Sequence, residues 1–132
     1  MIPLAVERLL RYVYGKVMTK MSGCIFCRII ARESSAALRY EDDRCIAIED
    51  TNPKAPVHVL IIPRKHIPTL ADGTEEDEDL LGHLLLVAAR VARDKQVSSF
   101  RTVINTNAEA GQTIYHLHLH LLGGRTLRWP PG

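Results

Sequence analysis

The chain has 132 residues, of which 46% are hydrophobic and 24% are charged, proportions typical of a single folded domain. Seventeen Lys and Arg residues against fifteen Asp and Glu give a net charge of +2, which is too small for a protein whose partner is duplex nucleic acid. No apolar run approaches the ~20 residues that cross a bilayer, so we expect no membrane partner.

The first twenty residues differ from the rest of the chain. Their four basic residues are spread among apolar ones, which is a poor match to a secretory signal. We treat residues 1–20 as an N-terminal extension without assigned function and expect one domain at residues 21–132. The three cysteines do not make a disulfide framework, which favours a reducing, cytoplasmic location.

The sequence predicts two helices and five strands. A short helix is expected at residues 25–31. A longer amphipathic helix begins at the acidic run after Thr74 and continues to about Asp94, and we interpret His83 on this helix as a surface or interface residue. Five strands are predicted at residues 37–41, 44–49, 57–62, 101–106 and 114–122. Consecutive short strands with one long helix favour an α+β fold around a five-stranded antiparallel sheet.

The run from His116 to Leu122 has a histidine at every second position, each followed by an apolar residue. In an extended strand this spacing puts His116, His118 and His120 on one face and the leucines on the other. Such a row either binds a transition metal or supplies a nucleophile and proton-transfer groups. The polar loop at residues 105–113 offers amides and the side chains of Gln112 and Thr113 to phosphate oxygens, which favours the second interpretation.

Several separated motifs resemble the histidine triad superfamily. They are the histidine run, the preceding Gly111-Gln112-Thr113, and the segment from Asp50 to His58. The ending Leu122-Gly123-Gly124-Arg125, followed by Trp129-Pro130-Pro131-Gly132, resembles the Hint branch of purine nucleoside phosphoramidases. This resemblance implies a histidine triad fold and a hydrolase of the adenosine 5′-monophosphoramidase type. Its substrates would be purine nucleoside 5′-phosphoramidates and aminoacyl adenylates.

The resemblance assigns the catalytic roles. It makes His118 the nucleophile, which forms a nucleotidyl-histidine intermediate while its other ring nitrogen is held by the backbone carbonyl of His116. His120 and His58 surround the phosphate and help to pass a proton to the leaving amine, and Thr113 stands where a serine is common. A neutral imidazole has the lone pair that nucleophilic attack needs.

The resemblance also implies the substrate contacts. Asn105 and Gly111 would hold the phosphate together with Gln112, and Asp50 would accept hydrogen bonds from the ribose. The base would contact Phe26, Ile29 and Leu60. Trp129 either shapes the leaving-group side or serves as a packing anchor.

A metal site and a dimer complete what the resemblance implies. Zinc-bearing relatives use a Cys-x-x-Cys pair, the histidine of a Pro-x-x-His segment and the first triad histidine, which correspond here to Cys24, Cys27, His66 and His116. Four such ligands make a closed, structural zinc site, and no catalytic cofactor is expected. The expected assembly is a homodimer whose sheet is extended across the interface.

Three alternative functions stay open. One is a dinucleoside polyphosphate hydrolase of the Fhit-like branch, against which the Trp-Pro-Pro-Gly ending speaks. Another is a scaffold that binds nucleotide or zinc with negligible turnover. The third is a mononuclear zinc hydrolase, although no Asp or Glu lies next to the histidine run in the sequence.

Overall fold

The computed structural model describes residues 23–132, so the proposed extension at residues 1–20 lies outside the described part of the chain. The chain divides into two units, Met1–Ser34 and Ser35–Gly132. In the first unit, helix α2 (Ile25–Ile30) begins after Cys24, whose Sγ accepts a hydrogen bond from the backbone N–H of Cys27. Because Ala31 caps the C-terminal end of α2, the predicted helix at residues 25–31 is confirmed to within one residue.

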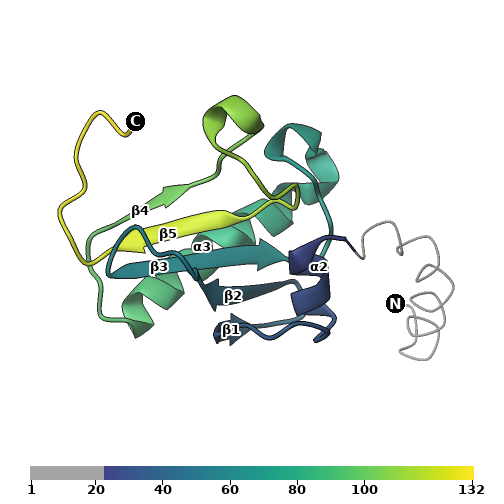
Figure 1. Cartoon of the computed structure of the whole chain (residues 1–132), viewed down its shortest axis with the longest axis horizontal. Coiled ribbons are helices and arrows are strands. Elements are labelled where there is room, and N and C mark those ends of the chain that lie inside the picture. The colour runs from purple at the N-terminus through teal and green to yellow at the C-terminus, as the bar shows by residue number, and fades with distance from the viewer. Residues whose placement is uncertain (1–22) are drawn as a thin grey trace, which may run out of the picture. The chain divides into compact units, whose positions relative to one another are not determined.

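The second unit contains a five-stranded antiparallel sheet. The strands are β1 (Leu38–Glu41), β2 (Cys45–Glu49), β3 (Val57–Pro63), β4 (Phe100–Val103) and β5 (Leu119–Gly123). Their order across the sheet is β1-β2-β3-β5-β4, which leaves β1 and β4 at the two edges (Figure 1). The predicted α+β fold class and antiparallel sheet are therefore confirmed.

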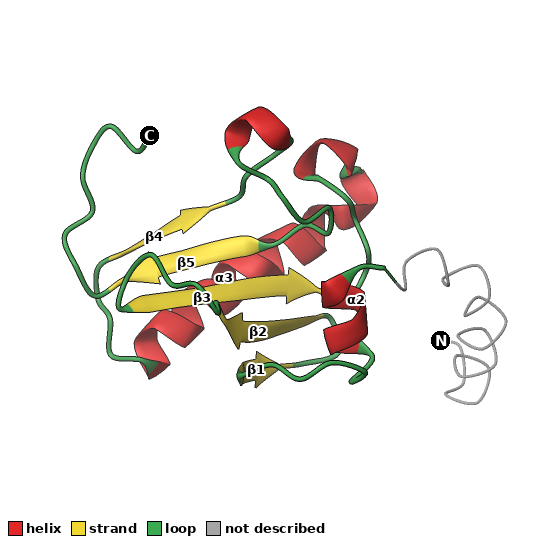
Figure 2. Ribbon diagram, in the orientation of Figure 1, coloured by secondary structure: helices red, strands yellow, loops and turns green. Residues whose placement is uncertain are grey.

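Helix α3 (Glu78–Asp94) covers one face of this sheet (Figure 2). The Asp77 carboxylate accepts a hydrogen bond from the backbone N–H of Thr74, as the acidic start predicted, but the first turn is a separate 3₁₀ helix, η3 (Glu75–Asp77). The buried residues of α3, such as Leu84 and Val91, pack in one apolar cluster with residues of β2, β3 and β5. Burial of such side chains stabilises the fold by roughly 1.5–3 kcal/mol each.

The predicted strand at residues 114–122 is wrong in its first half. Strand β5 begins only at Leu119, so His116 and His118 precede it and the three histidines do not form one row along a strand. The register pairs Ile61 with Leu119, and continuing it would bring Pro63 opposite Leu117. Proline has no amide to donate to a ladder, and the Leu117 amide donates instead to the carbonyl oxygen of Ile67.

The predicted strand at residues 101–106 is also too long. Strand β4 ends at Val103, which pairs with His120 near the start of β5. The residues that follow leave the sheet and lead into the polar loop. Within the described residues, no helix is long and apolar enough to cross a membrane.

Candidate active site

The strand register brings two of the predicted histidines to one face of the sheet. His58 pairs with Leu122, and Leu60 pairs with His120. Paired residues project to the same side, while the alternate residues Leu119 and Leu121 are buried in the core under α3. His58 and His120 therefore lie on the face of the sheet that α3 does not cover.

The His118 ring is held by a backbone carbonyl group from two residues earlier in the chain. Its Nδ1 lies 2.7 Å from the carbonyl oxygen of His116, and a carbonyl only accepts, so Nδ1 carries the proton and the lone pair of the neutral ring is on Nε2. The ring centroid of His118 is 5.0 Å from that of His120. Burial lowers the pKa of His118, which favours the neutral ring that a nucleophile requires.

His58 and His120 form a directed pair. The backbone N–H of Lys54 donates to Nδ1 of His58 at 2.9 Å, so the neutral ring has its proton on Nε2. This Nε2 lies 2.9 Å from Nδ1 of His120, which must accept. The remaining proton of His120 is then on Nε2, and both tautomers are set by one backbone amide.

Burial favours the uncharged form of this pair, whereas the nearby Asp50 carboxylate favours the protonated form by raising both pKa values. Burial lowers the pKa of His58, and it lowers that of His120 to about 4, with the neighbouring His118 and His58 acting in the same direction. Two neutral rings joined by a hydrogen bond are suited to take up one proton together when a negative group approaches.

Asp50 lies beside these histidines, although it is distant from His120 in sequence. Its Oδ2 is 3.3 Å from Nε2 of His58, and its Oδ1 accepts from the backbone N–H of Asn52. One ligand atom each of Asp50, His58 and His120 lie within 4.8 Å of one another. The absence of a sequence neighbour therefore does not exclude a catalytic metal, but the only lone pair of neutral His58 is engaged by Lys54.

The polar loop is built around Gln112. Its side-chain oxygen accepts from the amide of Asn107, and its Nε2 donates to the carbonyls of Pro68 and Ile114. The chain turns here through a 3₁₀ helix, η4 (Ala108–Ala110), and Gly111 has a φ of 102°. A side chain is strained in this conformation. Because the Gln112 side chain is used within the loop, it positions the polar loop and has no spare donor for a ligand.

Other predicted phosphate ligands lie on the same loop. A Cβ added at Gly111 would be 3.8 Å from Nδ2 of the half-buried Asn105, so the two residues are neighbours. The side chain of Thr113 is exposed. Asn105, Gly111 and Thr113 thus belong to one accessible segment that leads directly into His116 and His118.

The predicted metal ligands occur as two pairs, one in each unit. In the first unit, the sulfur atoms of Cys24 and Cys27 lie within 4.8 Å of each other. In the second unit, Nδ1 of His66 is 3.0 Å from Nδ1 of His116. His116 is fully buried, and its Nε2 donates to the carbonyl oxygen of Pro63 at 2.8 Å. The lone pair of His116 is therefore on the nitrogen that faces His66.

The remaining predicted substrate residues are placed separately. Leu60 is buried in β3 on the same side of the sheet as His120. Phe26, which is buried, and Ile29 lie on α2 in the first unit, so a pocket that they share with Leu60 stays a prediction. Trp129 is 81% exposed, and its ring is approached by the guanidinium of Arg101 at 5.9 Å.

A second cluster joins the β1–β2 turn to α3. Arg44 donates to Nδ1 of His83, so Nε2 of His83 donates to the Asp42 carboxylate at 2.6 Å. Cys45 completes a group of three possible metal ligands, but burial raises the pKa of its thiol to about 12. The raised pKa favours the protonated thiol, and the bonds from Arg44 to His83 and from His83 to Asp42 make this cluster a hydrogen-bonded link between the turn and α3. His83 is half-buried within it rather than simply on the surface.

Similarities to known proteins cover most of the described chain. Residues 23–126 match the family model described as "Scavenger mRNA decapping enzyme C-term binding". An uncharacterised HIT-like protein of Synechocystis is 60% identical over 109 residues, 82% of this chain and 96% of that protein.

Two solved structures are similar in both fold and sequence. A HIT family hydrolase from Legionella pneumophila Philadelphia 1 is 45% identical with a TM-score of 0.82, over 83% of this chain and all of that one. A Zn-bound histidine triad family protein from Mycobacterium smegmatis is 31% identical with a TM-score of 0.70, over 79% of this chain and 76% of that one.

Proposed function

Because the chain belongs to the histidine triad family, we propose that it is a nucleotide-binding hydrolase in which Nε2 of His118 is the nucleophile. The observation that carries this proposal is the 2.7 Å contact between Nδ1 of His118 and the His116 carbonyl. It leaves the lone pair on Nε2 and supports the positive charge that the ring acquires on attack. The likeness to the Legionella pneumophila hydrolase supports the reaction class.

The proposed substrates are purine nucleoside 5′-phosphoramidates, such as AMP-amines, and aminoacyl adenylates. The Trp129-Pro130-Pro131-Gly132 ending supports this choice, since it resembles the branch that cleaves P–N bonds. Asp50, which borders the histidine pair, is the proposed acceptor for the ribose hydroxyls, and Phe26, Ile29 and Leu60 are the proposed base contacts.

The first chemical step transfers the nucleotidyl group to His118. In a phosphoramidate, Nε2 of His118 forms a bond to the α-phosphorus as the P–N bond breaks, and the leaving nitrogen takes a proton. In an aminoacyl adenylate the bond that breaks is P–O, and the amino acid leaves through its carboxylate. The His58–His120 pair supplies the proton to the leaving nitrogen, because the anionic phosphate favours the protonated form of the pair. Asp50, whose Oδ2 is 3.3 Å from Nε2 of His58, stabilises that protonated form.

The second step releases the nucleotide. Water attacks the phosphorus and gives its proton to the pair, which the first step left neutral, and the bond from phosphorus to His118 breaks. The products from a phosphoramidate are the nucleoside monophosphate and the free amine, and His118 recovers its lone pair. Asn105 and the Thr113 hydroxyl are the proposed donors to the phosphate oxygens, whereas the Gly111 amide donates to the carbonyl oxygen of Ala108 and so positions the loop.

Cys24, Cys27, His66 and His116 are the proposed ligands of one structural zinc ion. The donor set fits, because each unit contributes a pair whose ligand atoms are already close. The bond from His116 to Pro63 is the outer contact that orients a metal-bound histidine. Four ligands of this type leave no open position, so the ion would join the segment containing α2 to the residues before β5.

A homodimer is the proposed assembly. Strand β4 is at the edge of the sheet, and the exposed apolar residues include Leu85, Leu86 and Phe100. Unpaired edges and exposed apolar surface are both features that a second copy would cover. Pairing through β4 would extend the sheet from one protomer into the other.

Substrate comparison with brief chelation tests the proposed reaction. We expect adenosine 5′-phosphoramidate to be hydrolysed with a higher kcat/KM than diadenosine triphosphate, with activity that survives removal of free metal. A preference for the dinucleotide would instead indicate a polyphosphate hydrolase. Activity lost on chelation and restored by zinc, with the fold unchanged by circular dichroism, would indicate a metal hydrolase. Nucleotide binding without turnover would indicate a scaffold.

A further inference from the structure

A cavity of about 530 Å³ lies between the strands β4 and β5 and the C-terminal segment, residues 124–132. Residues of β4 and β5 line it together with Asn105, and the C-terminal segment closes another side. Three of its lining residues are arginines, namely Arg101, Arg125 and Arg128. The cavity is therefore rich in positive charge, and it borders the polar loop at residues 105–113 through Asn105.

The strand register shows how close Arg101, which lines this cavity, is to His120 of the proposed active site. Arg101 pairs with Leu122, and Val103 pairs with His120. Paired side chains project to the same side, so Arg101 shares the face of the sheet that carries His120. Residues two apart on a strand are separated by ~7 Å. Arg101 is thus one row of side chains away from His120.

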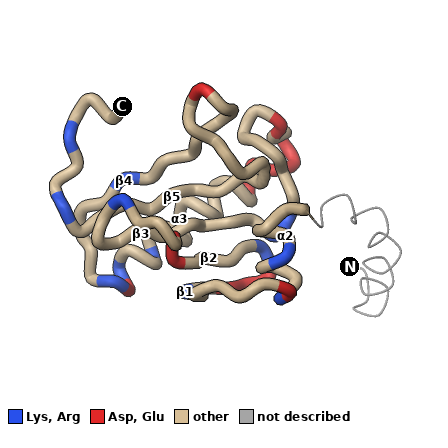
Figure 3. Tube along the Cα trace, viewed as in Figure 1, with Lys and Arg blue, Asp and Glu red and all other residues tan. Residues whose placement is uncertain are grey.

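The three guanidinium groups have no carboxylate partner among residues 23–132. Arg101 donates to the carbonyl oxygen of Arg128, and Arg125 donates to those of Lys54 and Thr126. Neutral carbonyl groups do not offset the positive charges of these side chains. Figure 3 shows basic segments along β4 and the C-terminal segment without an acidic segment between them.

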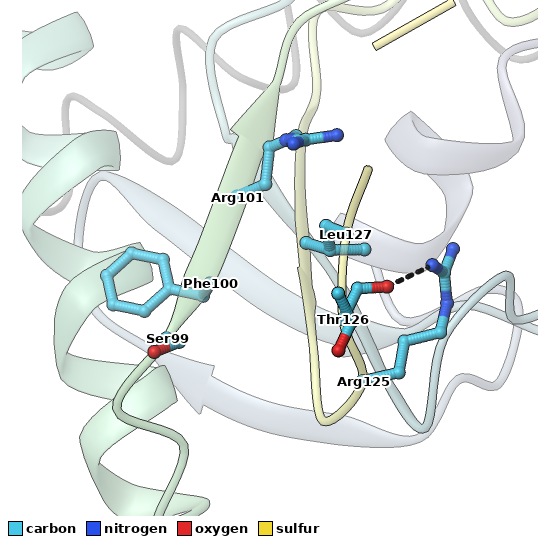
Figure 4. Close-up of a pocket in the computed structure, with 6 residues that line it drawn as sticks. All are labelled: Ser99, Phe100, Arg101, Arg125, Thr126 and Leu127. Carbon is cyan, nitrogen blue, oxygen red and sulfur yellow. Dashed lines mark hydrogen bonds between the residues drawn. The ribbon is translucent and has the colours of Figure 1, made fainter. Parts of the chain in front are cut away.

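Two of these arginines come from different elements of the fold. Figure 4 shows Arg101 projecting from β4 and Arg125 from the segment after β5, on either side of Leu127. Both residues also line a neighbouring cavity of about 530 Å³ that includes Phe100. An anion held by Arg101 would lie next to the apolar side chains of Phe100 and Leu127, which suits a ligand with both kinds of group.

We propose that the arginine-lined cavity is a subsite for a carboxylate on the leaving amine. This inference rests on the proposed function and narrows its substrates to nucleoside 5′-phosphoryl amino acids with a free carboxylate. A guanidinium group presents two parallel N–H donors to the two oxygens of a carboxylate. The amine of an amino acid is joined through one carbon to its carboxylate, so the anion stays close to the P–N bond.

The turnover test compares three leaving groups of similar shape. They are tyramine, tyrosine and tyrosine methyl ester, each joined to adenosine 5′-phosphate through nitrogen. A charge-assisted pair corresponds to about 10-fold or more in kcat/KM, so we expect tyrosine to exceed its methyl ester by that factor. Arg128→Gln and Arg101→Gln should each reduce this ratio. Arg39→Gln on β1, at the other edge of the sheet, is the matched control and should not.

A binding test separates this inference from the proposed reaction. Hydrolysis-resistant adenosine 5′-carbamates of tyrosine and of its methyl ester are titrated into the full chain by calorimetry. We expect about 10-fold tighter binding of the carboxylate form. Equal affinity, or a preference that survives both arginine substitutions, would overturn the subsite even if phosphoramidates are hydrolysed. A preference that the arginine substitutions abolish would support the subsite even if no turnover occurs.

Discussion

The Nδ1 atom of His118 lies 2.7 Å from the carbonyl oxygen of His116, two residues earlier in the chain. This contact fixes the tautomer of the neutral His118 ring, because a carbonyl accepts hydrogen bonds and cannot donate one. The same two residues face different surroundings, since the His116 ring contacts His66 while the His118 ring contacts His120. Alternate histidines therefore have different neighbours, which their regular spacing does not reveal.

The bond from Lys54 to His58 predicts a directional role for His58. His58→Asn removes the ring that donates to His120, so we expect kcat to fall by about 10²-fold or more while KM changes less. His83→Asn is the matched control, because His83 lies on α3 in a different hydrogen-bonded cluster. Steady-state kinetics of both variants checks this. Equal losses of kcat would show that His58 acts only through the stability of the fold.

Burial of His120 predicts a stability that decreases in acid. Its pKa is lowered from the ordinary 6.5 to about 4, so between these values the unfolded chain binds a proton that the folded chain does not. The free energy of unfolding therefore falls as pH drops through this range. The lowered pKa of His58 acts in the same direction.

Urea unfolding at about pH 7.5 and about pH 5 measures this effect. Wild-type protein should lose more stability between the two conditions than His120→Gln, which has no ring to titrate. Both proteins should unfold in a single transition, so that the midpoints can be compared. An equal loss in the two proteins would contradict the assigned cause.

Removal of the thiols should separate zinc binding from chemistry. We expect one zinc per protomer by elemental analysis, and its loss in Cys24→Ser or Cys27→Ser with a lower Tm. Because the proposed ligands do not include His118 or His120, kcat measured well below the Tm should stay within a few-fold of wild type. Cys45→Ser is the control thiol substitution and should retain the metal. Wild-type protein without bound zinc would contradict the proposed site.

The sequence was most informative where local patterns are repeated. The apolar run of β3 and the apolar spacing of α3 predicted both elements to within a few residues, because β3 is buried along nearly its whole length and α3 buries one regular face. The alternation of the histidine run misled at His116 and His118, since the end of β3 at Pro63 leaves those residues without a paired strand. A pattern within one segment contains no information about where the neighbouring strand ends.

Long-range contacts explain what the sequence left undecided in the site. One ligand atom of Asp50 and one of His120 lie within 4.8 Å of each other, because the sheet places β5 beside the strand that carries His58. The arginines of the C-terminal cavity come from β4 and from the residues after β5, and only the sheet order makes them neighbours. Gln112 was assigned to the phosphate, but its side chain is used to hold the loop.

Exposed apolar residues on α3 and β4 predict the assembly state. Leu86 is 73% exposed, and a charge placed there would oppose burial against a second copy. Wild-type protein should sediment at about twice the 14.8 kDa mass of the chain at micromolar concentration, and Leu86→Glu should shift it toward the monomer. Glu78→Gln, at the start of the same helix, is the control substitution. A wild-type monomer at this concentration would contradict the proposed dimer.

The most direct test of the proposed chemistry is to trap the covalent intermediate. Labelled adenosine phosphoramidate is mixed with enzyme, quenched within the first turnover and digested, and the peptide containing His118 is examined by mass spectrometry. We expect an adenylyl group on His118 that appears and decays fast enough to account for turnover, and none in His118→Asn. Turnover without this adduct, or with the adduct on another residue, would contradict the role of His118.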